Sequence, residues 1–402
     1  MRNIIYVAPF PMATTIKFAK AISELQNVRL FGVFQVQPSL ETKKLFYQTV
    51  TVQNALSVDH LDSVVRSLIG KYGRIHKLLG ILENVQEQLG VLRDRYKIPG
   101  MSAEGARQFR EKGIMKEVLR KNGVPCARYR RIKDLSSALQ FIDEVGFPIV
   151  LKPPSGAGCR STIRVSNFEE LMDALQEIKI RPILAEEFLT GIEHSMEAFT
   201  VNGVPRFCSF SRYYPSPLEV MQTPWIQWVV LFPNELDDPI YQQAKKVGIA
   251  AIRALGLQEG MTHMEWFRRP DGSVAVGEIG ARPPGAQISS VTGLIHGMNV
   301  YRTWARIMVD GVWDGPYTRK SAAAIAFLRG NGQGRIVSIQ GLSEAQKKMG
   351  DLVVDVKLPR VGAMKSSGYE GDGWVVIQHP DTERVKHAAL ELITTVKIKY
   401  QY

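Results

Sequence analysis

The sequence contains little cysteine. Its three cysteines, Cys126, Cys159 and Cys208, lie far apart and form no Cys-x-x-Cys pair. This spacing excludes a disulfide framework and a structural zinc site, and it favours a reducing, cytoplasmic compartment. No apolar run reaches the roughly 18 residues that a membrane span needs. We expect no signal peptide, because Pro9 and Pro11 interrupt the first apolar stretch, which is predicted to be a strand.

Glycine and proline are too scarce for a disordered or collagen-like chain, with 34 and 21 residues among 402. The first turn, residues 8–12, lacks the Gly-x-Gly-x-x-Gly pattern. A nicotinamide dinucleotide site is therefore not expected there. The 45% of hydrophobic and 22% of charged residues are ordinary for a globular protein, and the length favours two or three domains.

Acidic residues are fewer than basic ones, 39 against 51, which gives a net charge of +12. A basic balance suits an anionic ligand such as nucleic acid, a membrane surface or a nucleotide. Ten basic residues fall between Arg107 and Lys133, together with apolar residues at helical spacing. This segment is predicted to be a surface helix with a basic face. The alternative is that one or two of its charges contact a phosphate.

Strands and helices alternate along the first quarter of the chain. The apolar patterns predict strands at residues 3–8, 28–36 and 76–82 and helices at residues 15–25 and 59–72. Such alternation is typical of a parallel α/β sheet. The pattern breaks near Ile98–Ser102, where we place a domain boundary. Further on, a helix is predicted at residues 135–145 and strands at residues 147–152 and 163–165.

Two segments suggest contacts with a nucleotide. Lys152 ends an apolar strand and precedes a loop of small residues that includes Ser155, Gly156, Ala157 and Gly158. Small residues let backbone N–H groups approach phosphate oxygens, and lysine adds positive charge. An ordinary glycine-containing hairpin is the alternative. Glu186 and Glu187 end another apolar strand, either as a solvated strand end or as groups that bind an adenine amine and ribose hydroxyls.

The segment around Asp271-Gly272 is predicted to be a β-hairpin. Asp-Gly favours a two-residue type I′ turn, because both positions tolerate a positive φ. In that register Glu265 lies opposite Glu278 on one sheet face. The same register pairs Phe267 with Val276 and His263 with Gly280.

The two facing glutamates imply a cation. Their Cβ atoms would lie about 4.5–5.5 Å apart, where like charges are destabilising. Mg²⁺ is usually held by one or two carboxylates together with substrate phosphates. The alternative is a solvent-exposed pair or one protonated glutamate, which the apolar neighbours Phe267 and Val276 disfavour. Arg282 follows the second strand and could clamp a carboxylate or a transferred phosphoryl group.

In this order, these residues resemble the ATP-grasp superfamily, in particular its carboxylate–amine (L-amino acid) ligases and biotin carboxylase-like members. The matching residues are Lys112, Lys152 with its small-residue loop, Glu186–Leu189, Gly191–Glu193, Glu265, Glu278 and Arg282. The resemblance implies an α/β protein with the ATP-grasp fold, α+β at the nucleotide site. It implies a Rossmann-like pre-ATP-grasp domain at residues 1–105, the ATP-grasp domain at residues 106–315 and a small α+β domain at residues 316–402.

The resemblance also assigns roles in binding ATP. Lys112 and Lys152 would contact the phosphates, and the Ser155–Gly158 loop would fold over the β- and γ-phosphates. Glu186 would accept a hydrogen bond from the adenine amine. The remaining adenosine contacts would come from the backbone of Glu187, Phe188 and Leu189 at the adenine edge, from Glu193 at the ribose, and from Val150 and Phe267 on either side of the base.

At the reaction centre, the resemblance implies that Glu265 and Glu278 hold Mg²⁺ (or Mn²⁺) and that Arg282 stabilises an acyl phosphate. Most members of the family have a metal-binding Asn where this chain has Gly280. His263, opposite Gly280 in the predicted hairpin, could fill that position or orient a water molecule. The alternative is a weakened metal site. Arg282 is followed by Pro-Pro-Gly, so bicarbonate is a less expected substrate.

We therefore predict an ATP-dependent carboxylate–amine ligase that forms an amide bond through an acyl phosphate and releases ADP and phosphate. The alternatives are a ligase for a peptide, a protein or a purine-pathway substrate, and a non-catalytic ATP-binding regulator. The expected partners are small carboxylates and amines, not nucleic acid or membrane, and a homodimer is the default expectation. Specificity residues are expected among Tyr213, Tyr214, Trp225, Trp228 and residues 289–297.

Overall fold

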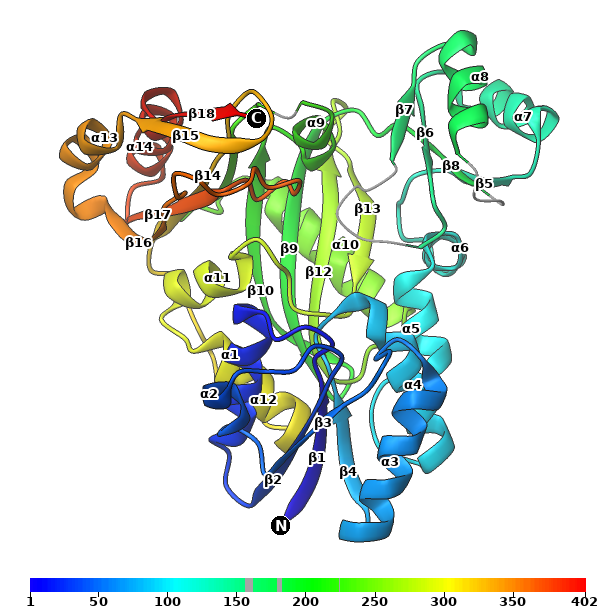
Figure 1. Ribbon diagram of the computed structural model, residues 1–402. Helices are drawn as coiled ribbons and strands as arrows, with labels where there is room; N and C mark the ends of the chain where they lie inside the picture. The colour runs from blue at the N-terminus through cyan, green and yellow to red at the C-terminus, as the bar shows by residue number, and fades with distance from the viewer. Residues whose placement is uncertain (156–161, 179–182, 224) are drawn as a thin grey trace.

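The computed structural model describes residues 1–155, 162–178, 183–223 and 225–402 (Figure 1). The N-terminal part is a parallel sheet flanked by helices. Its strands are β1 (Arg2–Val7), β2 (Val28–Phe34), β3 (Gln48–Thr51) and β4 (Ile75–Leu79), in the order β3-β2-β1-β4. Its helices are α1 (Ala13–Ser23), α2 (Leu40–Lys43), α3 (Val58–Tyr72), η1 (Glu83–Val85) and α4 (Gln86–Tyr96).

The predicted parallel sheet is confirmed, and the strands and helices expected there are present. β3 was not expected from the sequence. It is a short edge strand of sequence Gln-Thr-Val-Thr with no fully buried residue, so it lacks the apolar run that marks a central strand.

A basic segment leads from this sheet to a second, smaller sheet. It forms two helices, α5 (Ala103–Arg110) and α6 (Lys112–Lys121), because Glu111 between them has an extended backbone. The break places Lys112 at the first turn of α6. The smaller sheet is antiparallel, in the order β5-β8-β6-β7. Its elements are β5 (Tyr129–Ile132), α7 (Leu135–Val145), β6 (Ile149–Lys152), β7 (Ile163–Val165), α8 (Phe168–Glu177) and β8 (Ile183–Glu187).

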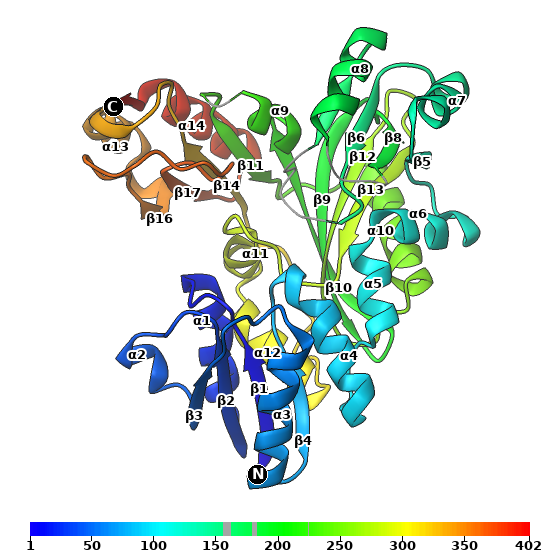
Figure 2. The same ribbon diagram turned by 45° about the vertical axis from the view of Figure 1, so that its right-hand side comes forward.

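An eight-stranded antiparallel sheet forms the centre of the molecule, in the order β13-β12-β9-β10-β11-β14-β17-β16. Its strands are β9 (Ile192–Val201), β10 (Val204–Tyr214), β11 (Trp228–Phe232), β12 (Gly260–Arg268), β13 (Val274–Gly280), β14 (Ala322–Leu328), β16 (Val353–Lys357) and β17 (Gly373–His379). In Figures 1 and 2 the small sheet and the C-terminal elements lie on opposite sides of its long central strands.

The remaining elements follow or flank this sheet. They are α9 (Pro217–Gln222), α10 (Pro239–Ala254), α11 (Ile288–His296), α12 (Val300–Asp310), β15 (Arg335–Gln340), α13 (Leu342–Met349), η2 (Gly350–Leu352), α14 (Thr382–Thr395) and β18 (Lys397–Gln401). Strands from residues 106–315 and 316–402 share the large sheet, and the predicted domain boundaries stay predictions. None of the described helices is both long and apolar enough to cross a bilayer.

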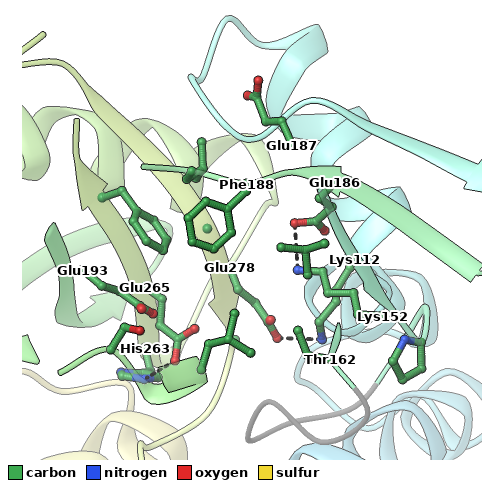
Figure 3. A pocket seen from close by; sticks show the side chains of 18 of the residues that line it. Lys112, Lys152, Thr162, Glu186, Glu187, Phe188, Glu193, His263, Glu265 and Glu278 are labelled. Carbon is green, nitrogen blue, oxygen red and sulfur yellow. Dashed lines mark hydrogen bonds and ion pairs between the residues drawn. The ribbon is translucent and has the colours of Figure 1, made fainter. Parts of the chain in front are cut away.

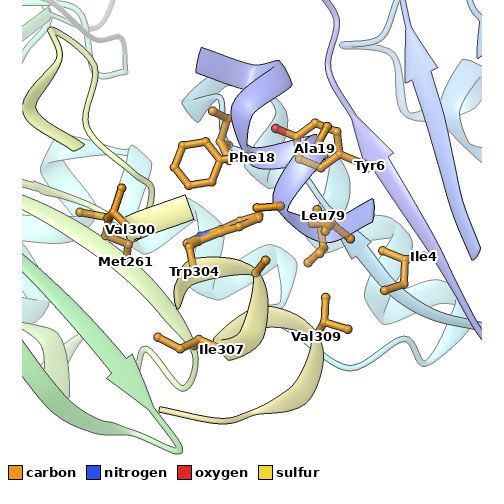
Figure 4. Packing of buried hydrophobic residues seen from close by; sticks show 14 of the residues in the cluster. Ile4, Tyr6, Phe18, Ala19, Leu79, Met261, Val300, Trp304, Ile307 and Val309 are labelled. Atoms are coloured by element: carbon orange, nitrogen blue, oxygen red, sulfur yellow. The ribbon is translucent and has the colours of Figure 1, made fainter. Parts of the chain in front are cut away.

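A buried apolar cluster joins the N-terminal sheet to the large sheet (Figure 4). Trp304 of α12 lies at its centre and meets Phe18 of α1 edge to face, with ring centroids 5.0 Å apart. Tyr6 of β1 and Phe199 of β9 belong to the same cluster. The N-terminal part is therefore packed against the rest of the chain through a continuous core.

The hairpin of β12 and β13 has the predicted glutamate pair but a different turn. Glu265 lies opposite Glu278, and His263 lies opposite Gly280, as expected. The predicted pairing of Phe267 with Val276 is wrong, because Val276 lies opposite Trp266. Two features of the hairpin account for this difference: its turn and a β-bulge. Each shifts the strand register by one residue, in opposite directions, so the pairing of Glu265 with Glu278 is restored.

The turn has three residues, not two. The Gly272 N–H donates to the Arg269 carbonyl, and Gly272 has a φ of +78°. This is a three-residue hairpin loop that ends in a left-handed glycine, and it shifts the register by one residue. A β-bulge at Gly277 shifts the register back. Val276 consequently points into the core on the far face, while Phe267 shares the face of Glu265.

Candidate functional site

A cleft lies between the small sheet and the β12–β13 end of the large sheet (Figure 3). It holds about 1290 Å³ of space, including the part open to solvent. Every predicted site residue that the structure describes lines it: Lys112, Val150, Lys152, Ser155, Glu186, Glu187, Phe188, Leu189, Glu193, His263, Glu265, Phe267, Glu278 and Arg282. Gly156, Ala157 and Gly158 lie outside the described residues.

One end of the cleft is apolar. Val150 of β6 lines it from the small sheet, and Phe267 of β12 lines it from the large sheet. Phe188 and Leu189, in the segment that joins the two sheets, lie at the same end, and the Phe188 ring is covered by the Arg164 guanidinium at 4.5 Å. Two apolar walls from different sheets suit a flat aromatic ring.

The other end holds the glutamate pair on β12 and β13. Lys112 Nζ lies 3.0 Å from Glu278 Oε1. Burial opposes ionisation of Glu278, but the ammonium groups of Lys112 and Lys152 outweigh it and lower the Glu278 pKa below its usual value. Burial likewise opposes the charge on Lys112, and Glu278 outweighs it and raises the Lys112 pKa. Glu278 is therefore held as a carboxylate.

Glu186 lies between two lysines. Its Oε2 atom is 2.8 Å from Lys152 Nζ and 3.2 Å from Lys116 Nζ, and its Oε1 atom is buried with no hydrogen-bond partner among the described residues. Lys116 also donates to the Gly277 carbonyl at 2.8 Å. The sequence analysis missed Lys116. Its spacing one helical turn after Lys112 was the available signal, because both lie on the buried face of α6.

The side chain of Glu187 points away from the other labelled residues (Figure 3). It accepts from Arg128 Nε at 2.7 Å and from the Arg128 N–H at 2.9 Å. The N–H groups of Glu187 and Phe188 donate to the carbonyls of Arg128 and Pro148. Since these two N–H groups already have acceptors, the predicted contact of the Glu187–Leu189 backbone with an adenine edge would use the N–H group of Leu189 or the carbonyl oxygens of this segment.

His263 is held by a glutamate that the sequence analysis missed. His263 Nδ1 lies 2.8 Å from Oε1 of the fully buried Glu197, which is its direct cross-strand neighbour on β9. Its Nε2 atom lies 3.8 Å from Glu265 Oε1. Burial opposes the imidazolium, but hydrogen bonds to Glu197 and Glu265 outweigh it and raise the His263 pKa to about 9. His263 thus adds a positive charge beside Glu265.

The N-terminal part contributes a further carboxylate to the cleft. Glu83 of η1 accepts from Arg282 Nε at 3.1 Å, and burial raises its pKa. Sequence reasoning did not single out Glu83. Its position just beyond β4 was the available signal, because ligands of parallel α/β sheets bind outside the carboxyl ends of the strands.

Three of the expected specificity residues lie in different environments. Tyr213 reaches the site, with its hydroxyl 3.5 Å from His263 Nε2. Trp228 is buried in the core and stacks on Phe327, with ring centroids 4.7 Å apart. Trp225 is 55% exposed. Packing against β14 therefore accounts for the tryptophan at position 228, and a role in substrate specificity is not needed to explain it.

The donor set at the glutamate pair fits a magnesium ion that arrives with phosphates. Within the described ranges, no group of three or more His, Cys, Asp or Glu residues could hold a metal ion by itself. Glu265 and Glu278 offer two carboxylates directly across the hairpin. Mg²⁺ usually takes one or two carboxylates and completes its octahedron with phosphate oxygens and water.

Residues 117–287, which include the small sheet and most of the cleft, match the family model of the ATP-grasp domain. This segment is an ATP-grasp domain. The expected ATP-grasp domain and the fold class are thereby confirmed, and solved structures of the same fold extend over the whole chain. The roles of the individual site residues stay predictions.

Two of the curated relatives that are 25% identical to this chain are informative. One is an uncharacterized protein, y4rH of Sinorhizobium fredii, aligned over 90% of this chain and 80% of the relative. The other is the L-arginine-specific L-amino acid ligase of Bacillus subtilis, aligned over 56% of this chain and 57% of the relative. The chain thus spans about half the length of that ligase.

Among solved structures, an L-amino acid ligase from Bacillus licheniformis has a TM-score of 0.82 at 20% identity and covers 100% of this chain and 99% of its own. N5-carboxyaminoimidazole ribonucleotide synthetase from Thermotoga maritima has a TM-score of 0.73 at 19% identity, with both chains covered completely (100%). At these identities the likeness establishes the shared fold.

Proposed function

We propose that the protein is an ATP-dependent carboxylate–amine ligase that forms an amide bond through an acyl phosphate. The observation that carries this proposal is the facing pair Glu265 and Glu278, set in one cleft with Lys112, Lys152 and Arg282. A cleft with this charge pattern in an ATP-grasp fold suits the transfer of a phosphoryl group, which needs positioning and charge neutralisation more than a covalent nucleophile.

The chain's own residues would bind the nucleotide in two places. Val150 and Phe267 would enclose the adenine, and Lys112 and Lys152 would bind the phosphates, each leaving its present carboxylate partner. Glu265 and Glu278 would hold Mg²⁺. When bound, the ion would supply charge neutralisation for the phosphates.

The substrate end of the cleft would carry out two transfers. A carboxylate oxygen attacks the γ-phosphorus and ADP leaves; the amine nitrogen then attacks the carbonyl carbon, phosphate leaves and the nitrogen loses a proton. Arg282 would orient the carboxylate and stabilise the acyl phosphate. Glu83, beside Arg282, offers a carboxylate for a substrate ammonium group.

Amino acids are the substrate class that the comparisons favour. The relative with a named amino acid specificity aligns over 56% of this chain, and the L-amino acid ligase structure has the higher TM-score, 0.82 against 0.73 for the purine-pathway synthetase. A purine-pathway carboxylate is the second candidate, because that synthetase covers the whole chain.

The test is ADP release from MgATP in the presence of pooled amino acids and pooled small carboxylates. We expect one pool to stimulate turnover, and Glu278→Gln to reduce that turnover at least about 100-fold, because one of the two metal carboxylates is lost. The control is Glu169→Gln, on the exposed face of α8.

Stimulation that survives in Glu278→Gln would contradict the assigned metal pair. If calorimetry detects no binding of MgATP to the wild type, the proposed ligase function is wrong. ATP binding without turnover in any pool would favour the nucleotide-binding regulator that the sequence left open.

A further inference from the structure

Lys116 is a cation buried behind the cleft, not in it. Its side chain is 1% exposed, and it is absent from the residues that line the cleft. Its Nζ atom lies 2.8 Å from the Gly277 carbonyl oxygen and 3.2 Å from Glu186 Oε2. A buried ammonium group persists only where it is paired, so these two contacts define its environment.

The two partners of Lys116 belong to different sheets. Glu186 is in β8 of the small sheet, and Gly277 is the bulged residue of β13 in the large sheet. Lys112, one turn earlier on the same face of α6, contacts Glu278, the residue after the bulge. The buried face of α6 therefore connects the nucleobase side of the cleft with the glutamate hairpin.

The two lysines that pair with Glu186 differ in their access to the cleft. One carboxylate oxygen forms ion pairs with two lysines, of which Lys152 lines the cleft and Lys116 does not. If Lys152 moves to a phosphate, Lys116 remains to balance the buried Glu186 carboxylate. Without Lys116, Lys152 would be the remaining ion-pair partner of Glu186 among the described residues, and moving it would leave a buried carboxylate without a paired cation.

We propose that Lys116 is a positioning residue of the nucleotide site, with two effects. It balances Glu186 so that Lys152 is free to bind the nucleotide phosphates, and it fixes the Gly277 bulge that sets Glu278 opposite Glu265. The first effect rests on the proposed function, because it takes the phosphates of ATP as the partner of Lys152. The second depends on the hairpin geometry alone.

The test is the affinity for MgADP, measured by calorimetry on the full chain, in a double-mutant cycle of Lys116→Met and Glu186→Gln. Methionine keeps most of the length of the unbranched lysine side chain and removes its charge. Lys116→Met should weaken binding about tenfold or more, because Lys152 then stays with Glu186. The matched control is Lys121→Met, on the exposed side of α6, where the lysine pairs with Glu117 at 2.7 Å.

The second substitution separates a positioning role from simple loss of packing. Glu186→Gln should weaken binding in the wild-type background but strengthen it in the Lys116→Met background, because it releases Lys152. The expected order of affinity is therefore wild type, Glu186→Gln, the double variant and Lys116→Met. A structural role would instead make the double variant the weakest of the four.

Three further outcomes of these binding measurements also support or overturn the proposed role of Lys116. Lys116→Met that binds like the wild type would overturn the proposal and leave the proposed function intact. A wild type that does not bind MgADP would overturn both. If Lys116→Met does not fold, the MgADP affinity of the double variant is compared with that of Glu186→Gln. An affinity of the double variant that is at least about threefold weaker supports the effect of Lys116 on the bulge. Equal affinities overturn that effect.

Discussion

At the scale of single residues, the site depends on charged pairs that are buried or half-buried. Glu197 orients His263, Lys116 balances Glu186, and Glu83 holds Arg282. None of these three partners belongs to the motif residues that the resemblance supplied. Their positions follow from which strands and helices meet, so contacts in the folded chain are needed to identify them.

The His263–Glu197 pair should make stability depend on pH. The fold raises the His263 pKa from 6.5 to about 9, so the folded state favours the protonated ring. The stabilisation is complete below about pH 6.5 and is lost as the pH rises through about 9, with a maximum on the order of 3 kcal/mol. The melting temperature of the metal-free protein should therefore fall across this range.

Glu197→Gln should flatten that fall, because it removes the main partner of the imidazolium. His296→Asn is the control: burial lowers the pKa of His296 to about 4, so this ring is neutral throughout the alkaline range. A melting temperature of Glu197→Gln that falls as steeply as that of the wild type would contradict the pairing.

At the scale of elements, two features of the β12–β13 hairpin illustrate the limit of pattern reasoning. The Asp-Gly signal located the turn, and the pairing of Glu265 with Glu278 was correct. The turn type and the bulge at Gly277 were not predicted. Both depend on which residues fit the two faces: the bulge turns Val276 into the core beneath α10, a preference that exists only once α10 packs there.

The loop between β8 and β9 should tolerate no side chain at Gly191. Its φ is +132°, and an added Cβ atom would lie 2.1 Å from the Arg268 carbonyl oxygen. Gly191→Ala should therefore cost more than about 2 kcal/mol and weaken MgADP binding, because the residue lines the cleft. Urea denaturation and calorimetry would measure the two effects.

Gly256 provides the matched control for that substitution. Its φ is +74°, and nothing lies within 4 Å of an added Cβ atom. Gly256→Ala should cost only the backbone strain, about 1 kcal/mol, and leave nucleotide affinity unchanged. Equal effects of the two substitutions would show that the close approach to Arg268 is not what requires glycine at position 191.

At the scale of the whole molecule, the cleft is assembled from three regions of the chain. Glu83 comes from the N-terminal part, Glu186 from the small sheet and Glu278 from the large sheet. The apolar cluster around Trp304 fixes the N-terminal part against the large sheet (Figure 4). The position of Glu83 beside Arg282 therefore depends on packing outside the cleft.

Trp304→Ala should test this dependence. Trp304 is 2% exposed, and its removal from a packed core should cost about 3–5 kcal/mol. We expect a lower melting temperature and a larger loss of turnover than of MgADP affinity, because the substrate end contains Glu83 and the nucleotide end does not. Trp225→Ala, at an exposed position, should change none of these quantities.

The sequence by itself determined the fold class and the chemical types at the cleft, because these follow from local patterns: alternating apolar segments, small-residue loops and carboxylates in a hairpin. The tertiary structure alone decided which groups balance one another. Lys116, Glu197 and Glu83 are far in sequence from Gly277, His263 and Arg282. Charge pairing over such separations depends on how sheets and helices pack, which no local pattern records.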